Sequence, residues 1–149
     1  HPELCSRPCL YFASGSFSNG MGCGFCHIEH TKRPGHLEKK HREALLQMPS
    51  SRAKGLIFSA VRAKVLAFDS SPDAARVLGE LSGACGEEAL AQPIERPTRM
   101  DRSIAQALDA ASLRVALLTL QRVAFVDNPQ AQAMAEAFIV GLRRAAAAR

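Results

Sequence analysis

Aromatic residues are scarce in this chain of 149 residues, making up 5% of it, with one Tyr and no Trp. The hydrophobic share is 47%, and much of it is Ala. A hydrophobic core outside the N-terminal segment must therefore be built mainly from Leu, Val, Ile and Ala.

The sequence also lacks the patterns on which membrane proteins and most enzymes depend. No apolar run approaches the roughly 20 residues that span a bilayer, so we expect no membrane partner. No His follows His41, and the C-terminal half shows no nucleophile–base pair, phosphate-binding loop or paired carboxylates. We therefore expect a protein that is not an enzyme.

Potential metal ligands are concentrated between Cys5 and His30. This segment holds four of the five cysteines and two of the five histidines, separated mostly by small residues. A fold shorter than about 40 residues usually needs a metal or disulfides, because its core is too small. Metal binding would then supply the folding free energy of this segment.

The spacing of these residues follows a known pattern. Seven residues separate Cys9 from Phe17, five separate Phe17 from Cys23, and three separate Cys23 from His27. Residues 3–42 thus resemble the CCCH-type zinc finger family, with Phe17 in place of the second cysteine. The resemblance implies a small irregular zinc finger over residues 1–35. The other matching positions are Tyr11, Phe12, Gly20 and Phe25.

The resemblance implies a bound zinc ion with an altered ligand set. A closed structural site has four Cys or His ligands, and the phenyl ring of Phe17 cannot serve as one. The matched ligands that remain are Cys9, Cys23 and His27. We predict Cys5 as the fourth, because a flexible Ser-Arg-Pro arm can fold it back. Cys26 and His30 are the alternatives, and His30 would replace His27 if Cys26 replaced Phe17.

The same resemblance implies binding of single-stranded RNA, with bases stacked on exposed rings. The rings at the matching positions are Tyr11, Phe12 and Phe25; Phe25 alternatively packs on the other aromatics beneath the metal. Residues 1–54 carry a net charge of +4, against +1 for residues 55–149, and positive charge favours a polyanion. The expected phosphate contacts are Arg7, Lys32 and Arg33. A reduced zinc site fits the nucleus or cytoplasm.

Three alternatives remain open. In the first, zinc is purely structural in a protein-interaction adaptor whose C-terminal helices bind a partner. The string Cys23-x-x-Cys26-His27 is also the attachment signature of c-type haem, for which Met48 or Met100 would be the axial sulfur. In an oxidising compartment, two disulfides are expected instead. They would join the four cysteines of the segment: Cys5, Cys9, Cys23 and Cys26.

An all-α region is predicted after the finger. It begins with a basic helix over residues 36–48, after a Pro34-Gly35 turn. Residues 49–99 are predicted to form two short helices and a loop. The first helix runs from Ser51 to Phe68, and the second begins at Pro72 with Ser71 as its N-cap. The only cysteine of this region, Cys85, is expected to be a buried, inert thiol.

Residues 100–149 are predicted to form an antiparallel helical hairpin. Its first helix is expected to run from Asp101 to Val126, and its second from Pro129 to Ala146. In each, apolar residues recur at helical spacing and so mark a buried face. The first stripe consists of Ile104, Leu108, Ala111, Val115, Leu118 and Phe125, and Leu117 and Leu120 broaden it. The second stripe consists of Met134, Phe138, Ile139 and Leu142.

Overall fold

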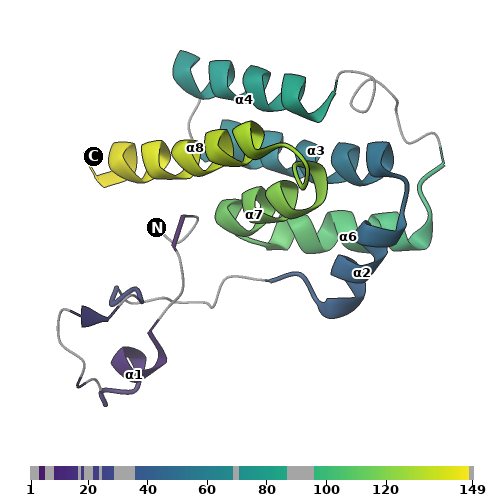
Figure 1. The fold of residues 1–149 in the computed structure, drawn as a ribbon. Helices are drawn as coiled ribbons and strands as arrows, with labels where there is room; N and C mark the ends of the chain where they lie inside the picture. The colour runs from purple at the N-terminus through teal and green to yellow at the C-terminus, as the bar shows by residue number, and fades with distance from the viewer. Residues whose placement is uncertain are drawn as a thin grey trace.

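Helices dominate the computed structural model, which describes residues 4–5, 9–16, 18, 22–23, 25–28, 36–68, 71–86 and 96–147. The helices in these ranges are α1 (Leu10–Ala13), α2 (Lys39–Gln47), α3 (Ser50–Phe68), α4 (Pro72–Cys85), α6 (Arg99–Ala110), α7 (Leu113–Ala124) and α8 (Pro129–Ala147). The predicted all-α region is confirmed (Figure 1). None of the helices in the described ranges is long and apolar enough to cross a membrane.

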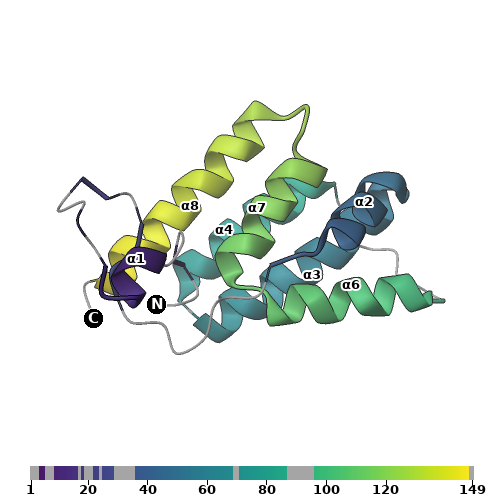
Figure 2. The same ribbon diagram turned by 90° about the horizontal axis from the view of Figure 1, so that it is seen from below.

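Helix α3 lies at the centre of the helical body. It packs against α2, α4, α6 and α7, while α8 packs against α7 and α4 (Figures 1 and 2). The buried side chains of α3 recur every three or four residues, apart from the adjacent pair Ile57 and Phe58, and this spacing places them on one side of the helix. They are Ala53, Ile57, Phe58, Val61 and Val65. As the composition predicted, Leu, Val, Ile and Ala supply most of the core around them.

Local capping signals set several helix ends. Helix α4 begins at Pro72, and the Ser71 hydroxyl accepts a hydrogen bond from the Ala74 backbone N–H at 3.2 Å, as predicted. Helix α3 begins within one residue of its predicted start, and α8 begins at Pro129 as expected. Cys85 is buried at the end of α4, and this burial raises the pKa of its thiol to about 11.

The predicted single helix from Asp101 to Val126 is wrong, because the chain forms two helices there. Ala111 is extended, and the Ser112 hydroxyl accepts a hydrogen bond from the Val115 backbone N–H at 3.3 Å, so that it caps α7. A serine gains more from such a cap than from a helix interior. The break also shifts the buried face. Val115 and Leu118 are only half-buried, whereas Leu113, Ala116, Leu117 and Leu120 are buried.

Side-chain hydrogen bonds connect the last two helices. The Gln121 side-chain amide donates to the Gln132 carbonyl oxygen at 2.9 Å, and the Gln132 amide donates to the Phe125 carbonyl oxygen at 2.7 Å. The Asn128 side-chain oxygen accepts from the Ala131 N–H at 3.0 Å and caps α8. Because α7 also packs against α3, the C-terminal helices share the core of the whole helical body.

A buried carboxylate fixes the start of α6. Asp101 is 3% exposed and pairs with the Arg52 guanidinium of α3. It also accepts hydrogen bonds from the Thr98 backbone N–H at 2.6 Å and the Thr98 hydroxyl at 2.7 Å, while the Thr98 hydroxyl accepts from the Asp101 N–H. The Arg52 hydrogen bond, aided by Thr98, lowers the pKa of Asp101 from 3.8 to about 2. The N-cap of α6 is thus Thr98, whereas Asp101, which we expected to cap this helix, is in its third position.

Substituting Asp101→Asn should lower the free energy of unfolding at pH 7 by about 1–3 kcal/mol, because it removes the ion pair and weakens the capping box. Since the folded-state pKa is depressed, this contribution is complete above the ordinary value of 3.8 and is lost as pH falls through about 2. Urea denaturation should therefore show the difference from wild type shrinking between pH 4 and pH 2. Asp109→Asn, on the exposed face of α6, is the control and should change stability little. A difference that stays constant with pH would contradict the role of the Asp101 charge.

Candidate metal centre

A backbone hydrogen bond brings the two ends of the cysteine segment together. The Cys9 N–H, at the residue that precedes α1, donates to the Cys26 carbonyl oxygen at 2.9 Å. After the single turn of α1, Gly15 reverses the chain with a φ of 71°, a conformation that favours glycine. Cys23 and His27, which flank Cys26, therefore lie beside Cys9.

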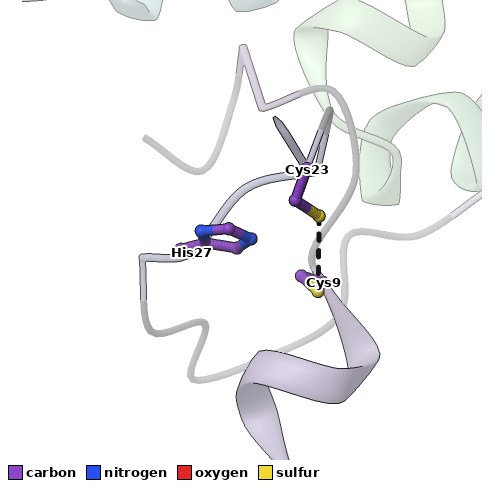
Figure 3. A group of neighbouring side chains, drawn as sticks. All are labelled: Cys9, Cys23 and His27. Atoms are coloured by element: carbon purple, nitrogen blue, oxygen red, sulfur yellow. Dashed lines mark hydrogen bonds between the residues drawn. The ribbon is translucent and has the colours of Figure 1, made fainter. Parts of the chain in front are cut away.

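The three ligand atoms of Cys9, Cys23 and His27 lie within 4.8 Å of one another. The Cys23 thiol is 3.9 Å from the Cys9 sulfur, and the His27 imidazole is directed toward both (Figure 3). A zinc ion bonded tetrahedrally to two thiolates at about 2.3 Å holds their sulfurs about 3.8 Å apart. The observed sulfur separation matches that requirement, and the group can hold a metal ion.

The imidazole of His27 is held by an aromatic neighbour. Phe12 of α1 stacks on it, with ring centroids 5.0 Å apart and planes inclined by 15°. The Nε2 atom of His27 is buried. This contact orients the imidazole and covers one face of the Phe12 ring. The sequence pattern predicted Phe12 as an RNA-stacking ring, but it gave no sign of this stacking on His27.

Exposed apolar side chains surround the metal-binding group. Tyr11 is 65% exposed and Phe25 is 48% exposed, so both rings are accessible as predicted for base stacking. Leu10 and Ile28, which directly follow Cys9 and His27, are also exposed at 63% and 61%. Sequence reasoning missed these two, although their positions next to ligands were a usable signal.

The remaining predicted ligands are placed differently. Cys5, predicted as the fourth ligand, is half-buried but does not belong to the group of three, and neither does Cys26. The neighbouring Leu4 is buried in the core that it shares with the helical body. The residues that the sequence pattern singled out but that lie outside the described residues are Arg7, Phe17, Gly20, His30, Lys32 and Arg33.

The geometry also bears on the alternative chemistries. All five cysteines are thiols, and the 3.9 Å between the Cys9 and Cys23 sulfurs far exceeds a disulfide bond of about 2.05 Å. The haem signature shares Cys23 and His27 with the metal-binding group, but it assigns no role to Cys9, toward which both are directed (Figure 3). A mononuclear metal site accounts for all three side chains.

No protein-family model, curated protein or solved structure matches this chain.

Proposed function

We propose that this protein binds zinc through Cys9, Cys23 and His27 and uses the surrounding segment to hold single-stranded RNA. The observation that carries the proposal is the convergence of three soft ligands at distances that suit zinc. Two thiols and an imidazole are ligands that suit zinc, whereas Mg²⁺ and Ca²⁺ prefer oxygen ligands. When bound, zinc supplies the cross-link that a segment with so little core requires.

The fourth coordination position belongs to one of three residues in this proposal. Cys26 and His30 lie close to His27 in sequence, whereas Cys5 directly follows Leu4, which is buried in the core shared with the helical body. A CCCH-like site with Phe17 at the second cysteine position would then be completed by a ligand from another part of the segment. Replacing each of the three residues separately identifies the one that contributes.

Exposed rings next to the ligands support the RNA part of the proposal. Tyr11 follows Cys9 by two residues and Phe25 precedes His27 by two, so zinc would fix the backbone that carries each ring. Single strands bind by stacking bases on such rings, while cations contact the phosphates. The cations nearest in sequence to the rings are Arg7, Lys32 and Arg33.

The variant Phe25→Ala should weaken binding of single-stranded RNA by about 1–3 kcal/mol, because it removes one stacking ring. Fluorescence anisotropy with a labelled oligonucleotide at several salt concentrations measures this loss. The variants Lys32→Ala and Arg33→Ala should weaken binding less and also reduce its salt dependence.

The matched control is Leu46→Ala, which removes an exposed apolar side chain from α2 and should leave RNA affinity unchanged. Zinc content is measured for every variant, so that loss of the metal is not mistaken for loss of a ring. Equal RNA affinity of zinc-loaded wild type and Phe25→Ala would reject the stacking role.

A protein-interaction adaptor is the second candidate function, and Leu10 and Ile28 favour it. Both are aliphatic and exposed, and aliphatic side chains offer no ring for base stacking. Two further exposed apolar residues could contact a protein partner: Val126, in the turn between α7 and α8, and Val140 of α8. RNA binding that is absent at low salt, with zinc bound, would favour the adaptor.

A further inference from the structure

The thiols of Cys9 and Cys23 are unequally accessible although they lie side by side. Cys9 is 3% exposed, whereas Cys23 is half-buried. Their sulfurs are 3.9 Å apart, and the hydrogen bond from the Cys9 N–H to the Cys26 carbonyl already holds the two chain segments together. A disulfide between them needs the sulfurs to approach to about 2.05 Å, a shift of about 2 Å.

We propose that Cys9 and Cys23 form a site of reversible oxidation by hydroperoxides, in which a disulfide between them replaces the metal. The release of zinc rests on the proposed function, because it requires that the same two sulfurs bind the ion. The formation of the disulfide does not, because it depends only on the separation and accessibility of the two thiols.

The reaction consists of two balanced steps. The Cys23 sulfur attacks the hydroperoxide, the O–O bond breaks, and a sulfenic acid forms while the other oxygen leaves as an alcohol or water. The Cys9 sulfur then attacks the Cys23 sulfur, so that the S–S bond forms and the S–O bond breaks. The oxygen leaves as water, taking up the proton of the Cys9 thiol. In total, two electrons pass from the two thiols to the peroxide.

Burial assigns the two roles. The half-buried Cys23 meets the oxidant first, and the buried Cys9 resolves the sulfenic acid. Cys85 competes poorly as an oxidant target, because it is buried among the helices and burial raises the pKa of its thiol to about 11. Cys26 adjoins His27 but does not belong to the group of three ligands.

The first experiment treats the reduced, metal-free full chain with one equivalent of hydrogen peroxide and maps the products by mass spectrometry. Chymotrypsin can cut after Phe12, Phe17 and Phe25, which places Cys9, Cys23 and Cys26 on different peptides. We expect the cross-link between the Cys9 and Cys23 peptides to exceed any other disulfide at least fivefold. Cys5 lies on the same peptide as Cys9, so a cross-link on this peptide could come from either residue. The same digestion of the Cys5→Ser variant shows whether Cys9 forms it.

A matched pair of variants tests the order of the two steps. In Cys9→Ser, the Cys23 sulfenic acid has lost its resolving thiol and should be trapped by a 1,3-dione reagent. In Cys23→Ser, the remaining buried Cys9 should take up at least fivefold less of the reagent. Cys85→Ala is the control and should give the wild-type cross-link, and circular dichroism confirms that each variant keeps its helices.

The outcomes separate this inference from the proposed function. A dominant cross-link between Cys23 and Cys26, or sulfinic acid in place of a disulfide, overturns the inference. In the zinc-loaded chain, peroxide should release one zinc per disulfide, and dithiothreitol should restore binding. Retention of zinc after the disulfide has formed overturns the exchange. A chain that never binds zinc but forms the Cys9–Cys23 disulfide overturns the proposed function and supports the oxidation site.

Discussion

Replacing either Cys9 or Cys23 with serine should weaken zinc binding by about 100-fold or more. Structural zinc is bound with about 10–16 kcal/mol, so each of four ligands accounts for roughly 3 kcal/mol. The wild-type reduced chain should hold one zinc ion, measured by elemental analysis. Competition with a chromophoric chelator gives the affinities, and replacement of zinc by cobalt reports on thiolate ligation by absorbance.

Cys85→Ala is the matched control, since it removes a cysteine that lies in the helical core and should leave zinc affinity unchanged. Substitution of Cys5, Cys26 or His30 should lower affinity only where that residue is the fourth ligand. Phe17→Cys should raise it, because the CCCH pattern places a ligand there. Less than a tenth of an equivalent of zinc in the wild-type chain would contradict the metal site, and an unchanged affinity in Phe17→Cys would contradict the alignment.

Truncation of Phe125 to alanine should lower the free energy of unfolding by about 3–5 kcal/mol. Phe125 is fully buried where α7 ends, among the largest side chains of the core, so its removal leaves a cavity. Its carbonyl oxygen also accepts the hydrogen bond from Gln132, and this bond fixes the turn into α8 next to the buried ring. Urea denaturation followed by circular dichroism measures the change.

The neighbouring Val126→Ala provides the control. Val126 is exposed in the same turn, and its truncation should change stability by less than about 0.5 kcal/mol. Equal destabilisation by the two variants would mean that the turn itself, and not the buried ring, limits stability. A loss below about 1 kcal/mol for Phe125→Ala would contradict its place in the core.

Sequence reasoning located the helix ends where local chemistry alone decides them. Pro72 with Ser71, and Pro129 after Asn128, mark starts that need no knowledge of the rest of the fold. It failed at Ala111 and Ser112, because alanine favours a helix and only the packing of α6 and α7 around α3 requires a break there. Because the break was not predicted, the expected stripe continues through Val115 and Leu118, which are half-buried, and leaves out Leu113 and Ala116, which are buried.

At the candidate site, too, the features with a local sequence signal could be predicted and those that depend on packing could not. The resemblance to the CCCH pattern grouped Cys9, Cys23 and His27, since ligand intervals are a local property of the sequence. Neither the stacking of Phe12 on His27 nor the burial of Leu4 in the helical core has such a local signal. Both depend on how separate segments meet, and the group of three does not include Cys5, which was predicted to complete it.

The central position of α3 has a consequence for biosynthesis. Its apolar face is covered largely by α6 and α7, and the last residue of α7 emerges 56 residues after the last residue of α3. At about 5–20 residues per second, this interval lasts roughly 3–11 s. During that time the Ile57, Val61 and Val65 side chains of a nascent chain lack their final partners on α7. The newly made α3 is therefore a segment of this protein on which a ribosome-associated chaperone has several seconds to act.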